Sequence, residues 1–135
     1  MKKGYIMNKN EFEQIFAQAS MAANKAYSDA TPKAMAVQNS GINEGFDWSK
    51  PYEIVQDGVC GFAWLNFPVD GRSAIAKIMK EFGAYKDYYG GLSFWSSDLM
   101  HDTTQSMQRK EAGIKAAAKI FEAHGMKCYP MSRMD

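Results

Sequence analysis

The sequence predicts an α+β domain with a mixed, mostly antiparallel sheet of about four to five strands and about three packed helices. Three segments have apolar residues at intervals of three and four, as in amphipathic helices. Shorter segments rich in β-branched and aromatic residues lie between turn-forming residues, as strands do. The 135 residues, 46% of them apolar, are enough for one domain with a buried core. We expect a single domain over 1–135, with a flexible tail at 1–9.

The first predicted helix begins at Asn10. The Asn10 side chain can accept a hydrogen bond from the unpaired amides of the first turn, and Glu13 completes a capping box. The apolar residues that then recur on one face are Phe12, Ile15, Phe16, Ala19, Ala22, Ala23 and Ala26. We expect the helix to end before Pro32, followed by a short strand at 34–38 and a surface loop at 39–51.

Residues 52–56 and 59–67 are predicted to pair as a β-hairpin, with Asp57 and Gly58 as its turn. Both faces of the second strand are apolar, which is typical of a central strand that is covered on both sides. Gly61 within this strand indicates a bulge or the close approach of another element.

A second helix is predicted after Asp70 or Ser73, either of which can cap it. Its buried face consists of Ile75, Ile78, Met79 and Phe82. Gly83 is expected to end it in the left-handed conformation. A strand at 89–95 and a polar loop at 96–105 should follow.

Ser106 is expected to cap the third helix, whose buried stripe is Ile114, Ala117, Ala118 and Phe121. Gly113 within it indicates that another element or a second subunit packs close. Gly125 should end the helix. The last strand, 126–131, should lie at a sheet edge because Pro130 cannot donate a backbone hydrogen bond.

Composition restricts the classes of function. The net charge of +1 does not favour a protein that coats duplex nucleic acid, although residues 106–133 contain six Lys or Arg and two Glu, a local charge of +4. No apolar run reaches the roughly 20 residues of a membrane span, and no signal peptide is apparent, so we expect no membrane contact and a cytosolic protein. Cys60 and Cys128 are predicted to be buried free thiols, with no metal and no cofactor.

Four blocks of sequence together resemble a family of small proteins widespread in tailed-bacteriophage genomes. They are Gly58–Val59–Cys60–Gly61–Phe62–Ala63–Trp64, Tyr89–Gly90–Gly91–Leu92–Ser93–Phe94–Trp95, Gln105–Ser106–Met107–Gln108–Arg109–Lys110–Glu111–Ala112 and Ser132–Arg133–Met134–Asp135. The likeness extends from about Met35 to Asp135. It implies a phage gene product that acts in the infected cell or in the virion, and it implies no particular activity.

The start of the third helix is the main candidate site. A helix N-terminus favours an anion, yet the charges in this first turn are Arg109 and Lys110, which oppose the helix dipole. A bound phosphate would compensate them, with Ser106, Gln105 and Arg133 as further contacts. The alternative is that Arg109 pairs with a carboxylate of the same chain. The candidates for that pairing are Asp98, Asp102, Glu111 and Asp135.

Aromatic residues form the second candidate site. The set consists of Tyr85, Tyr88, Tyr89, Trp95 and, by strand alternation, Trp64. Tyr89 or Trp95 could stack on a nucleobase, a contact worth about 1–3 kcal/mol. The alternative is that these side chains belong to the core or to a subunit interface.

The sequence favours a binding protein over an enzyme. His124 is expected to end the third helix, and the cluster around His101 matches no metal-ligand spacing that the sequence supports. The leading hypothesis is a non-catalytic phage accessory protein in the host cytoplasm that binds a nucleotide or nucleotide-like signal and thereby counters host defence. The alternative is a protein-binding phage component, either a virion part or an inhibitor of a host enzyme; a hydrolase using His101 is the third hypothesis. A homo-oligomer fits the first two.

Overall fold

The computed structural model describes residues 7–38, 45–55, 58–102 and 104–135. Four helices and six strands occur along this part of the chain, which confirms the α+β class. In chain order they are α1 (Lys9–Asp29), β1 (Met35–Val37), β2 (Glu53–Val55), β3 (Gly61–Phe67), α2 (Ala74–Glu81), β4 (Tyr85–Lys86), β5 (Leu92–Trp95), α3 (Ser96–Leu99), α4 (Met107–Ala123) and β6 (Tyr129–Met134).

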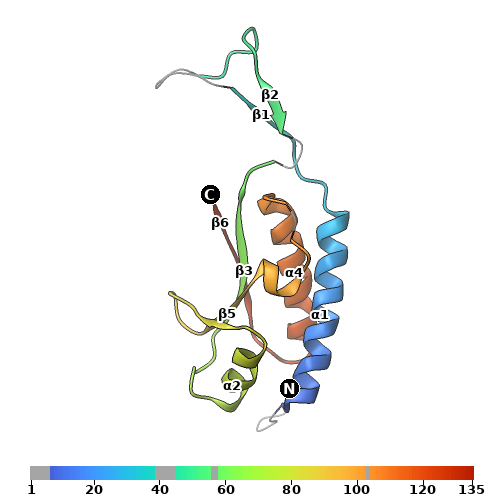
Figure 1. Cartoon of the computed structure of the whole chain (residues 1–135), viewed down its shortest axis with the longest axis vertical. Coiled ribbons are helices and arrows are strands. Elements are labelled where there is room, and N and C mark those ends of the chain that lie inside the picture. Colours follow the sequence, from blue (N-terminus) through green and yellow to red (C-terminus); the bar gives the residue numbers. More distant parts are fainter. Residues whose placement is uncertain (1–6, 39–44, 56–57, 103) are drawn as a thin grey trace.

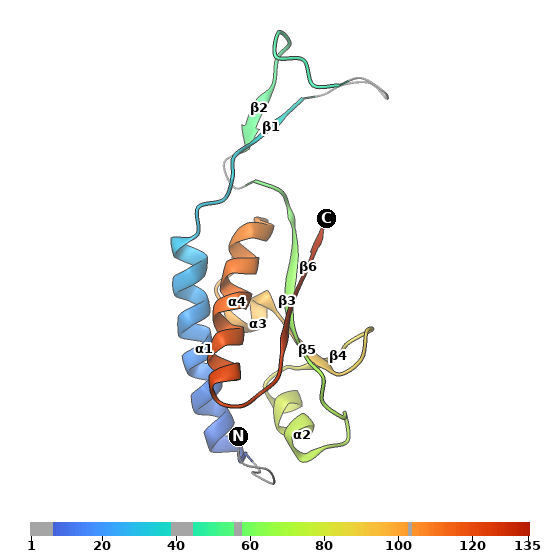
Figure 2. The same ribbon diagram turned by 180° about the vertical axis from the view of Figure 1, so that it is seen from behind.

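The main sheet has the strand order β4-β5-β3-β6, and each neighbouring pair is antiparallel. From β3 onward the elements follow the β-α-β-β-α-β order of split βαβ folds, with the short α3 inserted before α4. β3 is an interior strand between β5 and β6, as predicted, but the expectation that both of its faces are covered was wrong: the described helices pack on one face, and Phe62 and Asn66 on the other are only half-buried. β6 is an edge strand, as Pro130 predicted, with Pro130 opposite Leu65 of β3. Figures 1 and 2 show α4 between the sheet and α1, so the helices of the described chain cover one face of β3 and β6.

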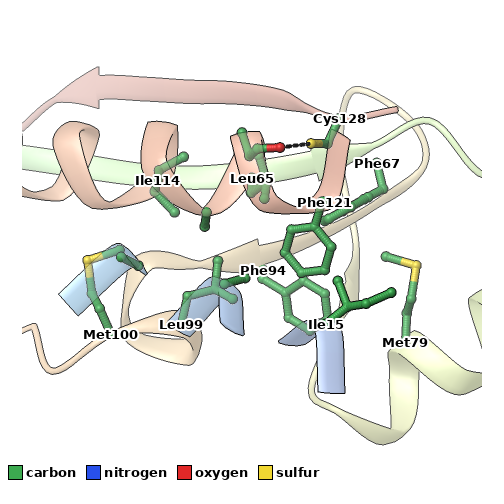
Figure 3. Packing of buried hydrophobic residues seen from close by; sticks show 14 of the residues in the cluster. Ile15, Leu65, Phe67, Met79, Phe94, Leu99, Met100, Ile114, Phe121 and Cys128 are labelled. Atoms are coloured by element: carbon green, nitrogen blue, oxygen red, sulfur yellow. Dashed lines mark hydrogen bonds between the residues drawn. The ribbon is translucent and has the colours of Figure 1, made fainter. Parts of the chain in front are cut away.

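The core lies between this covered face and the helices. It combines large side chains from α1, the central strands and α4, several of which are labelled in Figure 3. The fully buried ones include Phe12, Leu65, Phe67, Phe94 and Phe121. Because the burial of apolar side chains drives folding, this cluster determines which face of β3 packs in the core and which face remains available for other contacts.

The helices α1 and α4 run side by side in opposite directions (Figure 1). Gly113 of α4 lies at their contact, as predicted. A Cβ atom at Gly113 would lie 3.1 Å from the Ala23 carbonyl oxygen of α1 and would also overlap the Met100 side chain. The close approach brings the C-terminal end of α1 beside the N-terminal end of α4.

The predicted start of the first helix was wrong by two residues. Asn8, not Asn10, is the cap: its side chain accepts a hydrogen bond from the Glu11 amide at 2.8 Å, and Glu11 completes the capping box. Asn8 and Asn10 are each followed by a Glu three residues later, and the earlier match gives the longer helix. Lys9 is therefore helical, while residues 1–6 of the expected tail lie outside the described chain.

The predicted hairpin between 52–56 and 59–67 was also wrong. β2 pairs with β1, with Ala36 opposite Ile54, and Asp57 of the supposed turn lies outside the described residues. The physical reason is that a strand has two edges, and those of β3 are occupied by β5 and β6. We call residues 35–38 and 45–55 the arm, because they project beyond one end of the body (Figures 1 and 2). The predicted 39–51 loop is part of it, and its residues 39–44 are not described.

Several smaller expectations need correction. β5 begins at Leu92, three residues after the predicted start, because Gly90 and Gly91 turn the chain between β5 and the unpredicted strand β4. The supposed polar loop contains α3, and the last strand is shifted to Tyr129–Met134.

Other local expectations hold. Ser73 caps α2 and Ser106 caps α4. Cys128 is buried as predicted, but Cys60 is exposed. None of the helices in the described chain has the length and apolar character needed to cross a membrane.

Candidate functional site

The N-terminal end of α4 is joined to the start of β3. The Met107 amide donates to the Val59 carbonyl at 3.0 Å, and the Gly61 amide donates to the Gln105 carbonyl at 3.1 Å. The buried Ser106 accepts a hydrogen bond from the Arg109 amide at 3.3 Å through its Oγ atom. Ser106 and the first amide of α4 therefore have partners within the protein, while the Gln105 side chain is exposed.

Lys110 is buried beneath β3. Its Nζ atom donates to the Gly61 carbonyl at 3.0 Å and lies 3.7 Å from Asp102 Oδ2, and both charged side chains are 7% exposed. Asp102 also accepts a hydrogen bond from Ser96 Oγ at 2.6 Å. The ammonium group lies 5.6 Å from the centre of the Phe62 ring. A carboxylate of the chain, that of Asp102, thus neutralises Lys110 in the first turn of α4.

Arg109 reaches the other helix of the pair. Its guanidinium donates to the Tyr27 carbonyl at 3.1 Å, in the last turn of α1. The last carbonyls of a helix are unpaired and carry partial negative charge, so a cation there is favourable. Arg109 therefore opposes the dipole of α4 and complements that of α1.

The face of the sheet that the described helices do not cover is aromatic. We call it the outer face; β3 contributes Phe62, Trp64 and Asn66 to it, and cross-strand partners share a face. Trp95 of β5 lies opposite Trp64, and its ring packs edge-on against it at 5.7 Å and stacks on Tyr85 at 5.2 Å. Burial, together with the nearby charge of Asp87, raises the pKa of Tyr85 to about 12.

Arg133 extends over the same face from β6. It lies opposite Phe62 in the strand register, and its guanidinium carbon is 5.7 Å from the centre of the Phe62 ring. A cation at this distance is attracted to the ring. Arg133 is exposed, so its charge is accessible from solvent.

A hollow of about 330 Å³ opens beside Phe62. Its lining includes three of the residues that the sequence singled out, Trp95, Gln105 and Lys110. The remaining lining residues are Phe62, Ala63, Ser96, Ser97 and Asp102. We call this space the sheet hollow. Its volume falls at the lower end of the range for small-molecule sites.

Tyr89 lies apart from the sheet hollow. Tyr88 and Tyr89 are at the tip of the turn between β4 and β5, where their rings contact each other at 5.1 Å. The buried Asp87 organises this turn. Burial alone would raise the pKa of the Asp87 carboxyl, but hydrogen bonds from Ser93, the Tyr89 amide and Asn66 outweigh it and lower the pKa below its usual value.

Sequence reasoning missed the contribution of Phe62. It assigned the residue to an apolar face of β3 without connecting it to the start of the third helix. The available signal was strand alternation, which places Phe62 and Trp64 on one face. The position of Lys110 beneath Phe62 had no local signal, because it depends on the contact between α4 and β3.

A second hollow, of about 400 Å³, lies at the opposite end of the body from the arm. We call it the end hollow. Its lining is mostly apolar and comes from the end of β3, the start of α2 and the segment after α4, including Phe67, Ile75 and Met126. Across the described chain, no group of three or more His, Cys, Asp or Glu side chains is arranged to hold a metal ion.

Comparison of the chain with protein-family models, curated proteins and solved structures finds no match.

Proposed function

We propose that this protein binds a nucleotide or nucleotide-like signal on the outer face of its sheet, without converting it. The observation that supports this most directly is the sheet hollow, where Phe62 and Trp95 line the same space as the polar groups of Gln105 and Asp102. The Arg133 guanidinium lies over the Phe62 ring. Aromatic rings provide stacking surfaces for bases, and an arginine fork suits a phosphate. Sheets that bind single-stranded RNA in other proteins use aromatic side chains in the same way.

The charges around the sheet hollow support different positions for the base and the phosphate of the ligand. The Asp102 carboxylate lines the sheet hollow and would repel a phosphate, whereas it can accept hydrogen bonds from the amino groups of a base. The positive charge of Lys110 neutralises the negative charge of Asp102. We therefore expect the base to enter the sheet hollow and the phosphate to remain at its rim, near Arg133 and Gln105. In this arrangement Lys110 lines the sheet hollow, while Ser106 and Arg109 make contacts within the protein.

The resemblance to phage proteins supports a role in the cytoplasm of an infected host. A protein that holds a nucleotide signal without hydrolysing it lowers the free concentration of that signal in proportion to the protein present. We propose that this is how the protein counters host defence.

The test begins with native mass spectrometry of protein purified gently from producing and from phage-challenged cells. A small co-purifying mass, with raised absorbance at 260 nm, would support the proposal and identify the ligand. Titration with mononucleotides, cyclic dinucleotides and single-stranded oligonucleotides, followed by tryptophan fluorescence, would then measure affinity. An empty protein that responds to none of these probes would contradict the proposal.

Two substitutions test where the base and the phosphate of the ligand bind. Trp95→Ala should weaken binding about 5- to 150-fold, the equivalent of one stacked base. Arg133→Ala should weaken the binding of a nucleotide more than the binding of the matching nucleoside, because only the nucleotide has the phosphate. Arg72→Ala is the matched control, since Arg72 is an exposed arginine outside the sheet hollow. If Arg133→Ala lowered the affinity for nucleotide and nucleoside equally, the phosphate would bind elsewhere.

A protein-binding role is the second candidate, and the arm favours it. Trp48 at its surface is 70% exposed, and side chains of this size are enriched where proteins meet. A stoichiometric host protein recovered with the wild-type chain but not with Trp48→Ala would support this role.

A further inference from the structure

The arm presents apolar side chains that its own chain does not cover. Trp48, Tyr52 and Ile54 are 70%, 43% and 50% exposed, and Phe46 and Val37 are also among the exposed large apolar residues. β1 and β2 are three residues each and pair with each other in a two-stranded sheet. Such a sheet is marginal in water by itself. The arm therefore gains stability from anything that covers these side chains.

The end of the arm nevertheless has a defined shape. Gln38 joins its two sides: the side-chain amide donates to the Asp47 carbonyl at 2.8 Å, and its oxygen accepts from the Asp47 amide at 2.9 Å. The Trp48 ring packs edge-on against Phe46 at 4.6 Å and against Tyr52 at 5.2 Å. An aromatic cluster fixed in this way loses little conformational freedom when it docks.

The same chain offers a receptor of matching chemistry. The end hollow has a volume of about 400 Å³ and an apolar lining, which suits an inserted aromatic side chain. Its apolar lining residues include Phe67, Pro68, Val69, Ala74, Ile75 and Met126. The arm and the end hollow lie at opposite ends of the molecule (Figures 1 and 2). A chain therefore cannot fill its own end hollow with its own arm.

Charge is complementary between the two surfaces. Lys127 lines the end hollow, and the described part of the arm has Asp47 and Glu53 against Lys50. The Ser49 side chain and amide donate to Asp47 and lower its pKa, so this carboxylate stays ionised at neutral pH. Opposite charges at the rim of a contact favour the correct orientation and faster association.

We propose that the arm of one copy of this chain docks in the end hollow of a second copy, with Trp48 as the inserted side chain. The contact is head-to-tail, because the two surfaces differ. Each added copy leaves one free arm and one free end hollow, so the assembly closes into a ring or continues as a filament. The outer face of the sheet takes no part in the contact.

Sedimentation velocity across a range of protein concentrations tests the assembly. The wild-type protein should form oligomers, and Trp48→Ala should weaken self-association about 30-fold or more, as expected for a central tryptophan of an interface. Ala74→Glu should have the same effect by placing a carboxylate in the end hollow. Ala74 is exposed in the first turn of α2, where an acidic residue favours the helix, so this variant should fold. Tyr88→Ala is the control, because Tyr88 is a highly exposed aromatic residue outside both surfaces.

Mixing the two defective variants tests the direction of the contact. Trp48→Ala retains an intact end hollow and Ala74→Glu retains an intact arm, so together they should form a one-to-one heterodimer that cannot grow further. A symmetric contact between two arms would give no such complementation. A wild-type protein that is monomeric at all concentrations, or variants that show no heterodimer by native mass spectrometry, would overturn the proposal.

Discussion

Replacing Lys110 with Met separates a structural role of this residue from a direct role in ligand binding. The Met side chain retains most of the apolar stem of Lys and removes the charge. The change breaks the 3.0 Å hydrogen bond to the Gly61 carbonyl and leaves Asp102 buried without its cation. The Ser96 hydroxyl still donates to Asp102, which limits the loss.

The expected cost follows from this geometry. Removing one partner of a buried ion pair costs about 3–5 kcal/mol, and the remaining Ser96 contact places Lys110→Met near the lower value. For a chain of 135 residues, about 3 kcal/mol corresponds to a fall in melting temperature of about 10 °C. Lys115→Met is the matched control, because Lys115 is an exposed lysine of the same helix, and its change should stay within about 0.5 kcal/mol.

Thermal and urea unfolding followed by circular dichroism would measure these changes. The double variant Lys110→Met with Asp102→Asn removes both charges and should recover about 1–2 kcal/mol of the loss. A Lys110→Met protein as stable as wild type would refute the structural role. If that stable protein had also lost its affinity for nucleotides, Lys110 would contact the ligand directly, as the sequence alone suggested.

Three further predictions concern the sheet and the buried polar groups. Gly61→Ala should destabilise the fold by about 1–3 kcal/mol in urea unfolding, because its Cβ would lie 2.6 Å from a β6 carbonyl oxygen, while Gly71→Ala, with open space around it, should not. Native protein should react with a thiol reagent at the exposed Cys60, whereas Cys128, whose pKa burial raises to about 12, should react after unfolding; rapid labelling of both would contradict this. Asp87 has a lowered pKa in the folded state, so its contribution to stability is present above the unfolded pKa of about 4 and is lost as pH falls through the lower folded value. Asp87→Asn should therefore show a shallower loss of stability in acid, and an unchanged acid profile would contradict it.

The parts of the fold that the sequence predicted depend on local physics. Ser73 and Ser106 cap helices because their hydroxyls reach amides three residues later. Pro130 lies in an edge strand because it has no amide hydrogen to donate. These effects depend on a few neighbouring residues, so they can be predicted without knowledge of the rest of the chain.

The incorrect predictions involve choices between distant partners. Residues 53–55 and β3 are close in sequence, yet each edge of β3 is taken by a strand from the second half of the chain. Lys110 has the local pattern of an exposed helix cation, and its burial depends on Asp102 and on the contact with β3. The sequence could identify the aromatic and basic residues of the candidate site, but their separation into outer-face residues and internal partners required the tertiary structure.

The two proposed surfaces can be separated experimentally because they use different elements. Trp95 and Arg133 belong to the main sheet, whereas Trp48 belongs to the arm, which pairs only within its own two-stranded sheet among the described strands. Substitutions more than about 7–10 Å apart without shared partners usually have independent effects. We therefore expect Trp48→Ala to change assembly with little effect on nucleotide affinity, and Trp95→Ala to do the reverse. If Trp48→Ala also abolished nucleotide binding, the ligand site would require a second copy of the chain, and assembly and binding would be one function.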